Sequence, residues 1–119
     1  MKVTFYEYPK CSTCRNGKAF LEANGVEVEA IDMVKQPPSV KTLQQIIEKS
    51  NLPIQKFFNS RGMKYKELGL KDKLNQLTDI EKIELLSSDG MLIKRPLVVS
   101  QEDVVLGFKE ADYQQAFLS

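Results

Sequence analysis

Residues 2–14 read KVTFYEYPKCSTC, an alternating apolar segment followed by two cysteines. The β-branched and aromatic residues of 2–8 predict a strand, which Pro9 ends. A helical pattern follows over 12–23, so the cysteines lie where a strand passes into a helix. There a thiolate meets the unpaired N–H groups and the positive dipole end of the helix, which lower a thiol pKa and make the sulfur a better nucleophile near neutral pH.

Cys11 and Cys14 are the only cysteines of the chain, which has no histidine. One alternative is half of a zinc site, but structural zinc normally takes four Cys or His ligands, so it would require a symmetric dimer or carboxylate ligands. Another is a pair of inert, half-buried residues, since cysteine packs as a small hydrophobe. The position between strand and helix is the context in which C-x-x-C is thioredoxin-like. We therefore favour redox chemistry without a metal.

The composition fits one domain over residues 1–119, long enough for a core without disulfide staples. Seventeen Lys and Arg residues against sixteen Asp and Glu give a net charge of +1, so no global field would recruit nucleic acid or an anionic membrane. The chain has neither the apolar region of a signal peptide nor a stretch of transmembrane length. We expect a cytoplasmic monomer, in which a disulfide is transient and catalytic or sensing.

The helix over 12–23 leads into a β-α-β unit. Cys14 shares an apolar helical face with Leu21, so we expect Cys14 to point inward and Cys11 outward. Asn24-Gly25 is a helix stop followed by a turn. The pattern of residues 26–33 predicts a second strand, which would pair in parallel with the first through a right-handed crossover.

The segment 37–90 contains no convincing strand and predicts a helical insert. Ser39 is a plausible N-cap for one helix, and leucines at helical spacing over 70–77 indicate a second. A third begins with a capping box formed by Thr78 and Glu81.

Strand character returns over 97–99 and 104–106, separated by a polar turn that predicts an antiparallel hairpin, and a helix from about 109 to 118 closes the chain. This order is that of an α/β, thioredoxin-like (glutaredoxin-like) fold with a mixed four-stranded sheet. Its core would comprise 1–36 and 91–119, with the helical insert spliced between the two halves.

Pro96 stands at the start of the third predicted strand. In a thioredoxin-like fold a cis-proline at this position lies opposite the C-x-x-C pair, and an X-Pro bond has a small enough cis penalty for tertiary context to select that isomer. The alternative is a trans proline that merely starts an edge strand.

Several blocks together resemble the glutathione-linked arsenate reductase (ArsC) family and its Spx- and MgsR-like relatives over nearly the whole length. The closest likeness is to short members that carry C-x-x-C. The blocks are YPKCSTCRN (8–16), NSRG (59–62), YKELGL (65–70), KRPLVV (94–99) and GFKE (107–110).

The resemblance makes Cys11 the nucleophile, places Arg15 beside it, and makes Arg95 an anion-facing residue just before Pro96. A guanidinium can bind a thiolate or an oxyanion through two hydrogen bonds, which suits Arg15 and Arg95 to a binding role. The alternative is that both are ordinary solvated charges, as most arginines are.

Arsenate reductases of the family resemble one another in three arginines around the cysteine, of which only Arg95 is clearly present here. Asn59 and Phe108 align with the other two, with the cations Arg61 and Lys109 close by as candidate substitutes. We expect arsenate to be a poor substrate.

Two functions fit these residues. The first is a thiol–disulfide oxidoreductase in which Cys11 attacks a disulfide and Cys14 resolves the adduct, with protein or low-molecular-weight thiols as partners, glutathione as a co-substrate and no resident cofactor. The second is an Spx-like redox-sensing regulator that binds RNA polymerase, with no direct nucleic-acid binding. Such regulators usually carry additional C-terminal sequence after the point where this chain ends, so we favour the enzyme.

Overall fold

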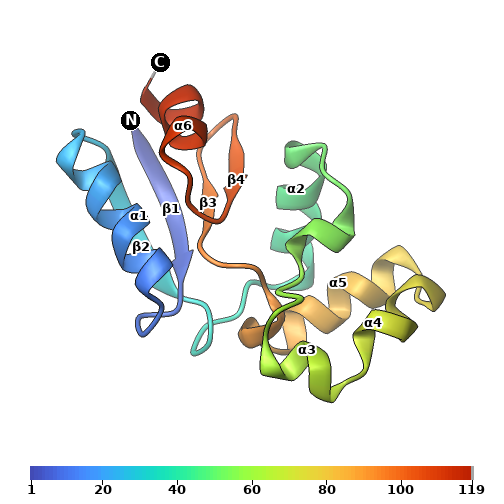
Figure 1. The fold of residues 1–119 in the computed structure, drawn as a ribbon. Helices are drawn as coiled ribbons and strands as arrows, with labels where there is room; N and C mark the ends of the chain where they lie inside the picture. The colour runs from blue at the N-terminus through green and yellow to red at the C-terminus, as the bar shows by residue number, and fades with distance from the viewer. Residues whose placement is uncertain (119) are drawn as a thin grey trace.

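The structure is a computed structural model that describes residues 1–118, in which strands pair into a four-stranded sheet of order β2-β1-β3-β4 (Figure 1). β1 pairs with β2 in parallel, whereas β1–β3 and β3–β4 are antiparallel. This is the predicted mixed sheet. The strands are β1 (Lys2–Glu7), β2 (Glu27–Asp32), β3 (Leu97–Val99) and β4 (Val104–Leu106).

Helices between and after the strands complete the element order. The α-helices are α1 (Ser12–Ala23), α2 (Val40–Ser50), α3 (Met63–Glu67), α4 (Leu70–Lys73), α5 (Asp79–Ser88) and α6 (Glu110–Tyr113). Short 3-10 turns occur at η1 (Ile54–Phe57), η2 (Leu74–Gln76) and η3 (Gly90–Leu92), and a π-helical segment, η4 (Gln114–Leu118), continues α6.

Alternation along the strands divides the core between the two faces of the sheet. Phe5 and Val98 pack in a cluster with residues of α1 and α6, whereas the adjacent Tyr6 and Leu97 pack in a cluster with residues of the insert. Figure 1 shows the insert on the right, with α3, α4 and α5 lying below α2 and away from α1 and α6. The fold therefore has a thioredoxin-like core, and the insert covers one face.

The β-α-β prediction holds in detail. α1 spans the predicted residues, Cys14 is fully buried on its inner face, and Cys11 is partly exposed. The helix ends at Asn24, and Gly25 follows with φ of 80°, a left-handed conformation that glycine adopts readily.

The predicted caps of the insert are present. Ser39 accepts a hydrogen bond from the Thr42 N–H at 3.1 Å at the start of α2. At the start of α5, Thr78 and Glu81 form both bonds of the capping box, at 3.2 and 2.8 Å.

The helix predicted over 70–77 is wrong in extent. α4 ends at Lys73, a 3-10 turn follows, and Leu77 is extended. The sequence pattern also missed α3, which buries no residue and so has no apolar periodicity to reveal it. Gly69 lies between α3 and α4 with φ of 63°, which separates the two short helices.

No helix within residues 1–118 is long and apolar enough to cross a membrane.

Gly90 is where the insert meets the end of β2. A Cβ on Gly90 would overlap the backbone carbonyl of Met33, and backbone cannot move aside as a flexible side chain can. We expect Gly90→Ala to lower the free energy of unfolding by about 3 kcal/mol, the upper end of the usual cost of overpacking. Urea unfolding checks this.

The matched control is Gly25→Ala, where a Cβ meets nothing within 4 Å and only the positive φ opposes it. That strain costs about 1 kcal/mol. Equal losses in the two variants would contradict the close approach of the insert to β2.

Candidate active site

Cys11 is the N-cap residue of α1. Its Sγ accepts a hydrogen bond from the backbone N–H of Cys14 at 3.4 Å, and its own N–H donates to the Tyr8 carbonyl at 2.9 Å. A serine or threonine hydroxyl often occupies this capping position. Here the Cys11 sulfur occupies it, so the unpaired backbone N–H groups at the start of α1 point toward the thiol.

The environment of Cys11 favours its thiolate. Partial burial acts to raise the pKa of the Cys11 thiol, but the Cys14 N–H, the Cys14 thiol and the Arg95 guanidinium together hold the pKa below its ordinary value. Hydrogen bonds to the charged form and a nearby opposite charge both lower the pKa of an acid. Cys11 is therefore the group that is more readily ionised and more accessible.

Cys14 has the opposite character. Burial raises the pKa of its thiol to about 12, opposed by the Tyr8 backbone and reinforced by Cys11. Tyr113 lies close enough for its own pKa to be raised, first by burial and then by Cys14. The pair thus combines a partly exposed, activated sulfur with a buried, protonated one.

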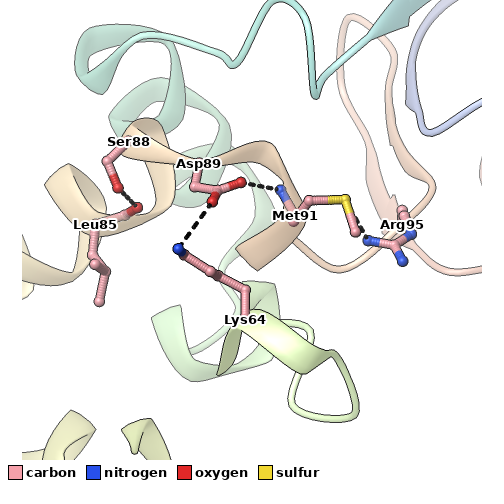
Figure 2. A network of polar contacts seen from close by, with 6 residues as sticks. All are labelled: Lys64, Leu85, Ser88, Asp89, Met91 and Arg95. Carbon is pink, nitrogen blue, oxygen red and sulfur yellow. Dashed lines mark hydrogen bonds and ion pairs between the residues drawn. The ribbon is translucent and has the colours of Figure 1, made fainter. Parts of the chain in front are cut away.

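Two side chains, those of Tyr8 and Met91, position Arg95 beside Cys11. Its guanidinium lies 5.2 Å from the centroid of the Tyr8 ring, within cation–π range, and donates to the Met91 Sδ at 3.9 Å. Figure 2 shows the further contacts that hold Met91. The Met91 N–H donates to Asp89 at 2.9 Å, and Asp89 pairs with Lys64 of α3 at 4.0 Å. The insert therefore contributes to the position of Arg95.

A cavity of about 390 Å³ opens beside Cys11. Four cationic side chains line it, and none of the described residues that line it is acidic. Such a cavity favours an anionic group next to the thiol. Its lining is Cys11, Thr13, Asn59, Arg61, Lys94, Arg95, Leu106, Gly107, Phe108 and Lys109.

The structure brings most of the predicted site residues together. Cys11, Arg61 and Arg95 line one cavity with Lys109, although Arg61 and Arg95 are far apart in the sequence. The Arg95–Pro96 bond is cis, which decides between the two isomers that the sequence left open, and the Pro96 carbonyl accepts from the Gly107 N–H at 2.8 Å.

Arg15 lies apart from the cavity. Its guanidinium donates to the Pro9 carbonyl at 3.1 Å, on the exposed side of the turn before α1, and Arg15 is not among the residues that line the cavity. A binding role for Arg15 stays a prediction.

Three contributors had no predicted role. Lys94 lines the cavity, and Tyr8 and Met91 contact Arg95. Lys94 and Tyr8 belong to the sequence blocks quoted above, so their place beside functional residues was the available signal. Met91 had none. Within residues 1–118, no group of three or more Cys, Asp or Glu side chains is placed to hold a metal ion.

These features define a thioredoxin-like protein with an asymmetric C-x-x-C pair at a helix N-terminus. The ArsC family model matches residues 6–116, and the chain belongs to the ArsC family. It is 52% identical to the uncharacterized protein YusI of Bacillus subtilis, over 97% of this chain and 98% of YusI. The solution structure of SACOL0876 from Staphylococcus aureus is 47% identical, with a TM-score of 0.91 over 98% of this chain and 99% of that one.

Other relatives divide between a reductase and regulators. An arsenate reductase of Rhizobium meliloti is 33% identical over 84% of this chain and 70% of its own length. The regulatory protein MgsR of B. subtilis is 28% identical over 93% of this chain and 86% of its own length. Global transcriptional regulators named Spx also match. Family membership and these relatives support a thiol-based redox function, catalytic or regulatory.

The two thiols should react differently with an alkylating reagent. An ordinary cysteine has a pKa of about 8.5. We expect the alkylation rate of Cys11 to reach half of its maximum at a lower pH, because the Cys11 thiolate is stabilised. Cys14 should resist until near pH 12 or until the protein unfolds. Alkylation across pH, read by peptide mass, checks this, and equal rates at both sites would contradict the assignment.

Arg95 should contribute measurably to that low pKa. Arg95→Leu removes a cation from the Cys11 sulfur, so the thiol pKa should rise and alkylation at pH 7 should slow by roughly tenfold, the scale of one hydrogen bond to a charged group.

Met91→Leu should shift the pKa in the same direction by less, because the guanidinium stays but loses one of its two contacts. Met63→Leu is the matched control, since Met63 is 73% exposed. An unchanged alkylation profile for Arg95→Leu would show that the helix N-terminus alone sets the pKa.

Proposed function

We propose that the protein is a thiol–disulfide oxidoreductase in which Cys11 is the nucleophile and Cys14 the resolving thiol. The observation that carries this proposal is the asymmetry of the pair: the partly exposed Cys11 thiol has a lowered pKa, and the Cys14 thiol is buried with a pKa of about 12. Reactive cysteines occur in electropositive, partly exposed environments, and cysteines that stay buried are inert.

In the first step the Cys11 thiolate attacks one sulfur of a substrate disulfide. The substrate S–S bond breaks, one substrate thiolate leaves, and a mixed disulfide joins Cys11 to the other sulfur. Arg95 and the N–H of Cys14 stabilise the attacking thiolate beforehand. The cations of the cavity would hold an anionic leaving group or a substrate carboxylate.

In the second step Cys14 loses its proton and attacks the Cys11 sulfur. The mixed disulfide breaks, the second substrate thiolate leaves and takes up a proton, and Cys11 and Cys14 become a disulfide. The substrate has gained two electrons and the pair has lost them. Formation of the mixed disulfide removes the negative charge of the Cys11 sulfur, and that charge is one of the causes that raise the Cys14 pKa.

Return to the dithiol form requires two electrons, which two monothiols or one dithiol supply: the first thiol attacks the Cys11 sulfur and frees Cys14, and the second attacks the resulting mixed disulfide and frees Cys11. We propose glutathione as this co-substrate, because its carboxylates suit a cavity lined by Arg61, Lys94 and Lys109 and its thiol can attack the Cys11 sulfur. A protein dithiol is the other class of reductant. We propose a cytoplasmic location, where such thiols are abundant.

The second candidate function is a redox-sensing regulator of transcription, with RNA polymerase as its partner. The names of MgsR and of the Spx relatives favour it. The same pair would then be a sensor, switched when oxidant converts the dithiol to a disulfide. The enzyme is preferred because the site provides both an activated nucleophile and a cavity for its partner.

The pair should close within one chain. We expect mild oxidant to give a monomer lighter by two hydrogens, which thiol reductants reverse, because Cys14 is the only other cysteine and its thiol interacts with the Cys11 sulfur. Cys14→Ser should accumulate mixed disulfides with substrates, and Cys11→Ser should form none. Mass spectrometry reads both, and a predominant intermolecular dimer would contradict an intramolecular resolving step.

Turnover separates the two functions. The enzyme should reduce a small disulfide catalytically with glutathione as reductant, and Cys11→Ser should abolish this activity. If the protein shows no turnover and is instead retained stoichiometrically by RNA polymerase, the regulatory function is correct and the enzymatic proposal is wrong.

Arsenate should be reduced weakly or not at all. A reductase must stabilise the oxyanion with fixed donors, and each missing donor typically costs on the order of a hundredfold in turnover. Only Arg95 of the three family arginines is clearly present. Arsenate turnover comparable to that of a family reductase would show that Arg61 and Lys109, which both line the cavity, replace the other two.

A further inference from the structure

A second hollow, of about 620 Å³, runs along β4 and adjoins the Cys11 cavity. All of β4 lines it, with Leu52 and Lys56 from the insert on one side and Ala116 of η4 on the other. Lys94 and Leu106 line both hollows, so the β4 groove adjoins the cavity that Cys11 lines.

The floor of the β4 groove is a strand edge. β4 is the last strand in the sheet order, and it lies at the margin of the sheet in Figure 1. The Gly107 N–H donates to the Pro96 carbonyl and the Ser100 N–H to the Asp103 carbonyl, each at 2.8 Å. These bonds determine which residues of β4 direct their backbone N–H and C=O groups toward β3.

Hydrogen-bonded and non-hydrogen-bonded pairs alternate in an antiparallel ladder. The residue pairs just beyond the two ends of β4, Ser100–Asp103 and Pro96–Gly107, are hydrogen-bonded. By alternation, Val105 bonds to Val98, whereas Val104 and Leu106 direct their N–H and C=O groups away from β3. The β4 groove therefore presents the backbone pattern of a strand that can accept a neighbour.

We propose that the β4 groove binds an extended segment of a client polypeptide, which pairs with the outward groups of Val104 and Leu106 and places its disulfide sulfur at Cys11. This inference rests on the proposed function and names its substrate class as protein disulfides. The continuity of the groove with the Cys11 cavity selects this occupant. A tripeptide such as glutathione can bind within the Cys11 cavity alone, whereas a longer chain extends into the β4 groove.

The lining also indicates which client segments would fit. Two cations, Lys56 and Lys94, face two carboxylates, Asp103 and Asp112, so the β4 groove has no excess charge to select a charged segment. Main-chain hydrogen bonds then supply most of the affinity, as in other cases of strand addition. We expect uncharged segments rich in β-branched residues to bind best.

Hydrogen exchange tests the pairing directly. Cys14→Ser is joined to a short, uncharged, Val- and Thr-rich peptide with one cysteine, or, in a parallel sample, to N-acetylcysteine. The amides of Val104 and Leu106 should exchange more slowly in the peptide adduct than in the N-acetylcysteine adduct. The amide of Val105, which already bonds to β3, should not change. Equal exchange at Val104 and Leu106 in the two adducts overturns the proposal.

A backbone substitution provides the second test. Val104→Pro removes an outward N–H without removing a ladder bond, as an edge strand tolerates, and Val104→Thr is the control that keeps the N–H. Each variant reacts with the peptide, and separately with N-acetylcysteine, supplied as a disulfide with thionitrobenzoate. Release of thionitrobenzoate measures the rate.

We expect Val104→Pro to slow the peptide reaction by about fivefold, the value of one net hydrogen bond, and to leave the N-acetylcysteine reaction unchanged. The unchanged small-molecule rate also shows that the variant is folded at Cys11. Equal peptide rates for Val104→Pro and Val104→Thr overturn the proposal. If neither disulfide reacts with wild-type Cys11, the proposed function itself fails.

Discussion

The hydrogen bond from the Cys14 N–H to the Cys11 sulfur is the interaction on which the site depends. It makes the thiol the N-cap of α1, so the same atom that starts the helix receives the positive end of its dipole. Cys14 follows one helical turn later and must face the core. The direction in which α1 leaves β1 therefore makes the two thiols differ in accessibility and in ionisation, and Arg95 adds to the difference in ionisation.

Packing behind α1 keeps this arrangement in place. Gly17 lets Tyr113 approach so closely that a Cβ would lie 3.0 Å from its hydroxyl, and that hydroxyl donates to the Gly107 carbonyl at 2.7 Å. Gly107 also lines the Cys11 cavity. α6 is thereby linked both to the helix that carries the pair and to the loop that bounds the cavity, and these contacts bury Cys14.

The insert contributes to the chemistry as well as to the core. Arg95 contacts Met91, and the insert holds Met91 in place, because the Met91 N–H donates to Asp89 and Asp89 pairs with Lys64 (Figure 2). Arg61, also from the insert, lines the cavity. A thioredoxin-like core alone would hold the cysteines and three of the cations that line the cavity, and the insert adds Arg61.

Much of this could be predicted from sequence because local signals agreed with one another. The strand-to-helix junction at Cys11 and the capping box at Thr78 are encoded within a few residues, and both appear as expected. α3 was missed because none of its residues is fully buried, and the predicted helix over 70–77 was too long because leucine spacing does not distinguish an α-helix from a 3-10 turn. The Tyr8–Arg95 contact and the junction of the two hollows at Lys94 depend on tertiary packing, which no short sequence window contains.

The reduction potential of the pair tests the central claim, that the reduced form is stabilised as a Cys11 thiolate by Arg95 and the helix. Wild type and Arg95→Leu would be equilibrated at pH 7 in buffers of graded thiol–disulfide ratio, and the fraction of intramolecular disulfide measured by mass. We predict a two-electron transition within one chain, with Arg95→Leu shifted to a more negative potential because its reduced form is less stable. Coincident transitions in the two proteins, or the absence of an intramolecular disulfide in either, would contradict the account.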